Sequence, residues 1–287
     1  MIDLFERILR SSGFKFTLIG LLSLLLLIPV TMIRDLISER QERSREATLE
    51  VSEKWGLPQT VTGPFITFPV PGKPSLNGES STTERKLHLM PGRLDVTGEV
   101  VPSEKKRGIF RVVVYETSLN MTGIFNLDND PAGLLPAGGG PDHPGYLNFG
   151  VSDLRGIREI GITVNGRVLD EVPGLFSHDL AGSGVHVRLP DEFLSAGGLN
   201  YDIRIVVAGS SELYFTPLGR TTTVDLSSTW SDPSFDGAFL PGSREISQQG
   251  FTAQWKVNEL NRNYPQVWYD RDYDVSDSRF GVRFLVP

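Results

Sequence analysis

The sequence predicts a mainly β protein: a single N-terminal transmembrane helix with a charged stalk, followed by a large antiparallel β-sandwich-like domain. Three observations lead to this prediction. Residues 16–33 contain no charged side chain. Residues 34–54 are dense in acidic and basic side chains. From residue 60 onward, short segments alternate polar and apolar residues between turn-forming glycines and prolines, which is typical of half-buried strands.

Composition excludes several classes of function. The 287 residues include no cysteine, which excludes disulfides, thiolate metal sites and a cysteine nucleophile. The net charge is -7, and the whole deficit lies in residues 55–287, so we expect no nucleic-acid partner. An acidic domain is repelled by an anionic bilayer, and we therefore expect this one to stand off the membrane.

The first element, residues 1–33, consists of an N-terminal cytoplasmic segment and a transmembrane helix, and its apolar part is residues 16–33. The 18 positions of this part make a helix about 27 Å long, close to the roughly 30 Å hydrocarbon core of a bilayer. The run Leu24–Ile28 has no polar face, and membrane helices tolerate a proline such as Pro29. Small residues for signal cleavage are missing, since the first alanine is Ala47. A lasting anchor is therefore favoured over a cleaved signal or a buried core helix.

The basic residues around this segment do not decide its orientation, because they lie on both sides of it. The size and acidity of the following domain favour a cytoplasmic N-terminus and an exported domain. The lipid bilayer is the first expected partner. A second hypothesis is an oligomer or an envelope protein partner held through the span, where Gly20 and Ser23 are the small residues.

The second element, residues 34–56, continues the helix as a charged stalk. Glu39 and Arg43 are four residues apart with the acid first, the better order for a helical ion pair. Gly56 and Pro58 are expected to end the helix. A thin apolar stripe leaves two alternatives, a solvated stalk or a helix docked on the domain or on a partner. The stripe includes Leu36, Ile37, Ala47, Val51 and Trp55.

The third element, residues 57–287, is the β-rich domain, with at least ten short strands. Asn165-Gly166 suits the tight type I′ turn of a hairpin. Pro131–Gly145 holds five glycines and four prolines, so it is either a surface loop or a linker that divides the domain into two lobes. The clearest strands are expected at 85–89, 93–97, 109–115, 185–189, 201–205 and 221–230.

No catalytic, cofactor-binding or metal-binding residue is assigned. His178, Asp179 and Ser183 lie close enough in sequence to suggest a hydrolase triad, but the nucleophile pattern G-x-S-x-G is absent and loop residues are the simpler interpretation. The histidines do not have the spacing of zinc ligands; they are His88, His143, His178 and His186.

Two further groups of residues, one acidic and one aromatic, each have a structural and a functional interpretation. Four acidic residues near the C-terminal end begin like a calcium loop, but Val275 and Gly281 replace the glycine and glutamate that such a loop needs, so an acidic surface is favoured. They are Asp270, Asp272, Asp274 and Asp277. Aromatic residues of the last quarter either line a ligand groove or fill the core. They are Trp230, Phe235, Phe239, Phe251, Trp255 and Trp268.

Residues 211–266 carry a specific combination of short motifs. These are Pro-x-Gly-Arg at 217–220, Trp-x-x-Pro-Ser-Phe at 230–235, Phe-Leu-Pro at 239–241 and Gly-Phe-x-Ala-x-Trp at 250–255. This stretch, and residues 24–40, 60–70 and 153–157, resemble the inner membrane protein CreD family. The family has further membrane helices after its periplasmic region, whereas this chain stops at Pro287 before a second span. A fragment, a truncated reading frame and a short relative all remain open.

The resemblance implies a location in the inner membrane of a Gram-negative bacterium, with a periplasmic β-domain. It also implies a link with cell envelope integrity and envelope stress, including responses to β-lactams. The family has no established catalytic residues, so none is transferred. We therefore expect a non-catalytic protein with a periplasmic binding or interaction domain. The alternative is a membrane-anchored periplasmic enzyme that acts on envelope glycan or lipid.

Overall fold

The structure is a computed structural model that describes residues 12–71, 84–128, 144–195 and 197–286. The chain forms two compact units, Met1–Leu49 and Glu50–Pro287.

The first unit contains most of one long helix, α2 (Ser12–Trp55), with Pro29 inside it. This helix is long and apolar enough to cross a membrane. On its charged part, Arg43 Nη2 donates to Glu39 Oε1 over 2.6 Å, which confirms the expected ion pair. The helix ends at Trp55, where the N–H of Gly56 donates to the carbonyl of Ser52 over 2.8 Å, as the sequence predicts.

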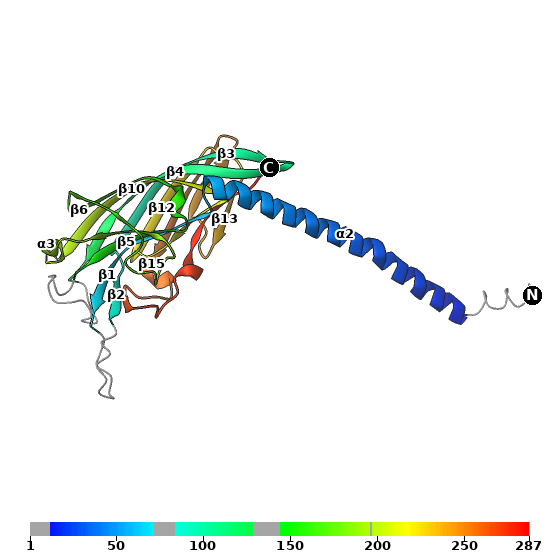
Figure 1. The fold of residues 1–287 in the computed structure, drawn as a ribbon, viewed down its shortest axis with the longest axis horizontal. Helices are drawn as coiled ribbons and strands as arrows, with labels where there is room; N and C mark the ends of the chain where they lie inside the picture. Colours follow the sequence, from blue (N-terminus) through cyan, green and yellow to red (C-terminus); the bar gives the residue numbers. More distant parts are fainter. Residues whose placement is uncertain (1–11, 72–83, 129–143, 196, 287) are drawn as a thin grey trace, which may run out of the picture. The chain divides into compact units, whose positions relative to one another are not determined.

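The second unit consists of two large β-sheets (Figure 1). The nine-stranded sheet, sheet A, runs in the order β13 (Pro233–Gly237), β17 (Phe280–Phe284), β11 (Glu212–Thr216), β1 (Gln59–Val70), β5 (Tyr146–Val151), β9 (Gly184–Arg188) and β8 (Val172–Pro173), with β2 (Arg85–Leu89) paired to β1 and β16 (Val267–Tyr269) paired to β2. The eight-stranded sheet, sheet B, runs in the order β14 (Ser243–Ser247), β15 (Gly250–Asn258), β12 (Thr221–Ser228), β3 (Arg93–Arg107), β4 (Phe110–Asn126), β10 (Gly198–Ser210), β6 (Ile157–Val164) and β7 (Arg167–Leu169). The short helices are α3 (Asp191–Leu194), η1 (Leu154–Gly156), η2 (Glu259–Asn261) and η3 (Ser276–Ser278).

Most neighbouring strands are antiparallel, as the sequence predicts, and two pairs are parallel. β1 runs parallel to β11, with Val61 opposite Phe215. β12 runs parallel to β3, with Val224 opposite Val96. More than 100 residues separate the two strands of each pair, and polar–apolar alternation within one strand does not encode the direction of so distant a partner.

The main core lies between the two sheets. Trp255 of sheet B packs on Phe280 of sheet A with ring centroids 5.7 Å apart, and Tyr115 packs on Phe284 at 5.2 Å. This is a sandwich arrangement. Most of the aromatic residues of the last quarter therefore belong to the core: Phe251 and Trp255 are buried in it, and Trp230, Phe235 and Phe239 pack against it partly buried.

A second apolar cluster lies on the other face of sheet A. Phe65 belongs to it, whereas the neighbouring Ile66 belongs to the main core, because successive residues of a strand point to opposite faces. Leu180 and Val275 come from the loops that follow β8 and β16. The other members are Met90, Leu218, Tyr264 and Trp268. These loops are thereby packed onto the outer side of the sheet.

The predicted hairpin is confirmed. β6 and β7 pair with Val164 opposite Arg167, and the turn residues Asn165 and Gly166 have φ angles of 49° and 78°. The segment 131–145, where a division into lobes was considered, lies almost entirely outside the described residues. Strands on both sides of it pair within both sheets, and residues 50–287 form one compact unit.

The last turn of α2 belongs to the β unit and packs into it. Ser52 is buried and accepts a hydrogen bond from Ser210 Oγ over 2.7 Å. Trp55 Nε1 donates to the carbonyl of Tyr115 over 3.3 Å, and Arg107 pairs with Glu50 at 2.7 Å. For this turn the docked alternative holds.

Candidate functional site

A groove lies on the outer face of sheet B, lined by polar and apolar residues of the described part of the domain. Its volume is about 1040 Å³. Residues from seven of the eight strands line it: Thr97, Glu99, Ser118, Asn120, Glu159, Gly161, Arg204, Val206, Asp225, Ser227, Ser243, Arg244, Glu245, Thr252 and Gln254, with six further residues. We call this surface the sheet B groove.

The strand registers arrange these side chains in two rows that cross the strands. The first row reads Ser243, Gln254, Asp225, Thr97, Asn120, Arg204 and Gly161. The second row reads Glu245, Thr252, Ser227, Glu99, Ser118, Val206 and Glu159. Each row places one side chain per strand on the same face. The groove floor is therefore built by register and not by a loop.

The second row is acidic and has no cation. Among the described residues, Glu99, Glu159 and Glu245 have no ion-pair partner at 4.0 Å or less. In the first row, Arg204 pairs with Asp202 at 3.3 Å. Asn120 Oδ1 is buried without a hydrogen-bond partner in the described part of the protein. The groove thus offers more acceptors than donors.

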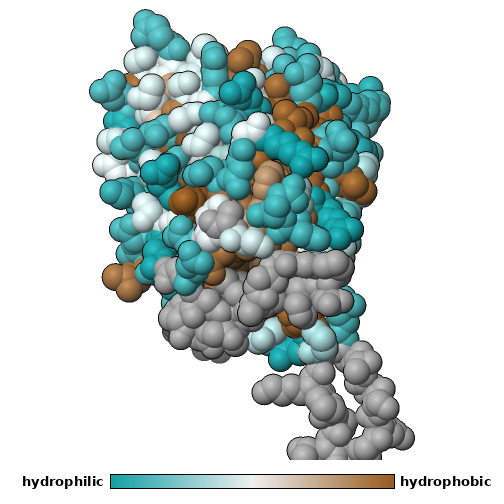
Figure 2. Space-filling model, turned by 90° about the vertical axis from the view of Figure 1, so that its left-hand side faces the viewer, coloured by the Kyte–Doolittle hydropathy of each residue, from teal (hydrophilic) through white to brown (hydrophobic). Residues whose placement is uncertain are grey.

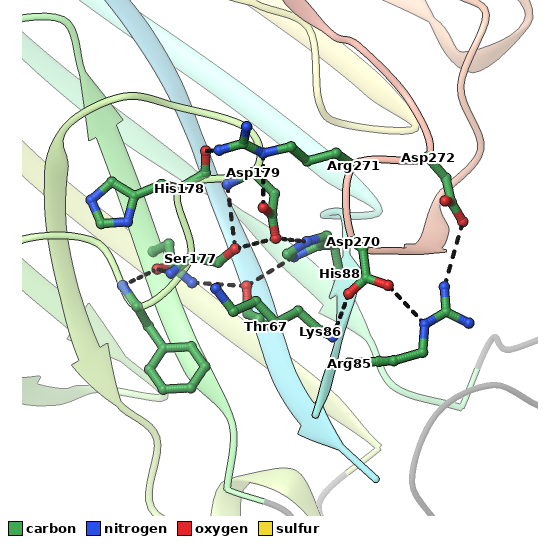
Figure 3. Close-up of polar contacts among 12 residues, drawn as sticks. Thr67, Arg85, Lys86, His88, Ser177, His178, Asp179, Asp270, Arg271 and Asp272 are labelled. Carbon is green, nitrogen blue, oxygen red and sulfur yellow. Dashed lines mark hydrogen bonds and ion pairs between the residues drawn. The ribbon is translucent and has the colours of Figure 1, made fainter. Parts of the chain in front are cut away.

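A polar network lies on the outer side of sheet A (Figure 3), and its residues are buried except for the partly buried Asp179 and the exposed Arg271. It consists of Thr67 (β1), His88 (β2), Asn148 (β5), Ser177 and Asp179 from the loop after β8, and Arg271 from the loop after β16. Asp179 Oδ2 is 3.2 Å from His88 Nε2 and accepts from Ser177 Oγ over 2.6 Å. Its Oδ1 accepts from Arg271 Nε over 3.1 Å. The carboxylate of Asp179 is the centre of the network.

The partners of His88 fix its tautomer. Asp179 can only accept, so His88 Nε2 carries the proton and donates it, and Nδ1 accepts from the hydroxyl of Thr67 over 3.0 Å. Asn148 Nδ2 in turn donates to Thr67 Oγ1 over 3.1 Å. Burial lowers the pKa of His88 below its ordinary 6.5, although Asp179 favours the charged form. The ring is therefore held neutral.

The pKa of Asp179 is shifted in the direction expected of an ion-paired carboxylate. Burial raises this pKa, but hydrogen bonds from Ser177 and Arg271 outweigh the burial and hold it below the ordinary 3.8. Ser177 donates to Asp179 and not to His88, and His88 is 0% exposed. A substrate therefore has no access to the ring. The network ties two loops to sheet A.

The proposed triad residues are not brought together. Asp179 is in the polar network, but the side chain of His178 is exposed, and only its carbonyl is used, by Arg271. Ser183 Oγ donates to the carbonyl of Val151. The partner of Asp179 is His88, which lies 91 residues away in the sequence. No local sequence pattern indicates this contact.

The four aspartates of the candidate calcium loop have separate roles. Asp270 accepts from Arg85 Nε over 2.7 Å and from the N–H of Lys86 over 2.8 Å, and Asp274 accepts from the N–H of Ser276. Asp272 lies 3.9 Å from Arg85, and Asp277 lies in η3. In the described part of the chain, no three His, Asp or Glu residues are grouped as metal ligands would be.

Of the two remaining histidines, the structure describes His186. His186 Nδ1 lies 2.7 Å from the carbonyl of Gly174, to which it can donate. His143 lies outside the described residues.

The face drawn in Figure 2 is covered mostly by hydrophilic residues, with apolar ones in small groups between them. Such a surface is typical of a domain that faces water.

The apolar helix and the two-sheet unit define a protein with a candidate membrane anchor and a β-sandwich-like unit. The family model described as inner membrane protein CreD matches residues 11–287. The inner membrane protein CreD of Escherichia coli (strain K12) is 32% identical over 250 residues, which cover 84% of this chain and 54% of that protein. The chain belongs to the CreD family. It spans about half the length of this curated relative.

Proposed function

We propose that this protein is a non-catalytic component of the cell envelope that contributes to envelope integrity under stress. Its N-terminus lies in the cytoplasm, and its β-domain lies in the periplasm and binds an envelope component. The single observation that supports this proposal is the sheet B groove, which holds about 1040 Å³ and is lined by hydroxyl, amide and carboxylate groups together with apolar side chains. Membership of an inner membrane protein family supports the location.

The binding proposal is tested by crosslinking in intact cells. Because the chain has no cysteine, an introduced cysteine is its single thiol. Ser118→Cys places a thiol in the second row of the groove, and Ser195→Cys places one at the exposed end of α3 as the matched control. With a reagent that joins a maleimide to a photoreactive group, we expect a discrete adduct from the groove cysteine alone after illumination. No adduct, or the same adducts from both positions, contradicts the proposal.

The topology proposal is tested with the same control variant. A membrane-impermeant maleimide added to intact spheroplasts should label Ser195→Cys as fully as it does after lysis. Labelling that requires lysis would place the domain in the cytoplasm and reverse the orientation.

One observation favours the alternative of an enzyme that acts on envelope glycan. Asp225 lies opposite Thr97, so Glu99 is only two positions along the neighbouring strand from it. Diagonal positions of this kind are about 7–8 Å apart, within the range of carboxylate separations in glycoside hydrolases. If purified protein degrades envelope glycan and Glu99→Gln or Asp225→Asn abolishes this, the non-catalytic proposal is wrong.

A further inference from the structure

We infer that the sheet B groove receives an extended peptide segment that carries lysine or arginine side chains and lies across the strands. This inference rests on the proposed binding function and adds the chemical class of the ligand. It follows from the charges of the two rows, their spacing and the donors that the groove lacks.

Charge gives the first argument. The second row presents Glu245, Glu99 and Glu159 without a cation, and all three side chains are exposed. The basic residues in the groove are elsewhere: Arg204 is paired with Asp202, and the Arg244 guanidinium lies 5.9 Å from the centre of the Phe235 ring. An anionic chain would meet three uncompensated carboxylates. A cationic chain would neutralise them.

Spacing gives the second argument. Neighbouring strands are about 4.8 Å apart, so carboxylates three strands apart are separated by about 14 Å. Glu245 and Glu99 are three strands apart, and so are Glu99 and Glu159. An extended peptide rises about 3.4 Å per residue and covers this distance in about four residues. A basic side chain at every fourth position would therefore meet each carboxylate in turn.

The groups between the carboxylates suit a peptide backbone. Thr252, Ser227 and Ser118 place hydroxyls, which donate and accept, between the acidic positions of the second row. In the first row, the buried acceptor Asn120 Oδ1 lacks a donor among the described residues, and a backbone N–H or an amine would supply one. Val206 is the one apolar side chain of the second row.

The test uses the full chain in nanodiscs of neutral lipid and fluorescent nine-residue peptides. The probe carries lysine at positions 1, 5 and 9 with glycine and serine between them. Matched peptides carry glutamate at these positions, or three adjacent lysines. We expect the spaced lysine peptide to bind more tightly than both. Equal binding of the glutamate peptide overturns the charge argument, and equal binding of the adjacent-lysine peptide overturns the spacing argument.

Variants locate the binding. Glu99→Gln with Glu159→Gln should weaken binding of the spaced peptide by about 30-fold, since each exposed ion pair contributes up to about 1 kcal/mol. The control, Asp170→Asn with Glu171→Gln, removes the same charge from exposed residues outside the groove and should change binding less than twofold. Equal weakening in both variants means unspecific attraction to an acidic protein and overturns the inference.

The two levels of the proposal fail in different ways. If Ser118→Cys gives its specific adduct in cells but the spaced lysine peptide does not bind, the groove is a binding site for another class of ligand, and only the inference is wrong. If neither result is obtained, the proposed function and the inference both fail.

Discussion

At the scale of the residue, the polar network connects stability to pH through His88. The folded state lowers the pKa of His88 below 6.5 by burial. Between the folded pKa and 6.5, the unfolded chain therefore binds more protons at this site than the folded chain does. The free energy of unfolding accordingly rises with pH in this window and falls on acidification. Above 6.5 the site contributes no pH dependence.

We predict that the protein loses stability between pH 7.5 and pH 5.5 because of His88. The loss at pH 5.5 should reach as much as about 1.4 kcal/mol, the value of one pH unit for one proton. It is measured from urea unfolding of the full chain followed by tryptophan fluorescence. His88→Gln should be less stable at pH 7.5 but should lose this pH dependence. His178→Gln, at an exposed ring, should keep it, and equal slopes in both variants would refute the assignment.

Sequence reasoning reached only part of this network. Asp179 stood out because it lies beside His178 and near Ser183, but its actual partners are His88 and Arg271. These residues meet because β2 and two loops pack on one face of sheet A. Such a contact depends on tertiary packing and has no pattern in the local sequence.

At the scale of the element, the junction between α2 and β1 is closely packed. Gln59 Nε2 donates to the carbonyls of Asp153 and Ala208, and the N–H of Leu57 donates to Asp153 Oδ2. Gly56 packs directly on β10, where an added Cβ would lie 2.5 Å from the carbonyl oxygen of Ala208. A side chain at this position must push the end of the helix away from the sheet.

We therefore predict that Gly56→Ala destabilises the β unit by about 1–3 kcal/mol, the usual effect of overpacking. Hydrogen exchange of the full chain should show faster exchange in residues 50–58 than in the unchanged protein. Gly182→Ala is the matched control, since a Cβ there has no atom within 4 Å. Its stability should stay within about 0.5 kcal/mol. If Gly56→Ala behaves like this control, the junction is not close-packed.

Individual strands were largely predictable, and their partners were not. The alternation in residues 85–89 matches β2, and Asn165-Gly166 forms the predicted turn. Polar–apolar alternation reports which side chains face the core, which is a local property. The parallel pairing of β1 with β11 and of β3 with β12 depends on the global topology.

At the scale of the whole molecule, the groove is a product of register and was invisible in the sequence. No local sequence pattern marks Glu99, Ser118 or Glu159, and they form one row only because three strand pairings align them. The sequence led us to assign no catalytic residue. This remains a prediction, because only turnover assays test it.

Sheet A also depends on its last strand. β17 pairs with both β11 and β13 and places Phe280, Val282 and Phe284 in the main core. A chain that ends at Ser278 should therefore lose cooperative urea unfolding, because two strands lose a partner and the core loses three large side chains. A chain that ends at Phe284 keeps β17 and serves as the control. Cooperative unfolding of the shorter chain would show that β17 is dispensable.

The parallel pairing of β1 and β11 also determines the order in which the sheet can be completed as the chain is synthesised from its N-terminus. Residues Gln59–Thr62 appear early, but their partners Leu213–Thr216 follow only after about 150 further residues. Until then this edge of β1 is an open row of backbone donors and acceptors, which other strands can occupy wrongly. Residues 59–62 are therefore where a newly made chain is most in need of protection from aggregation.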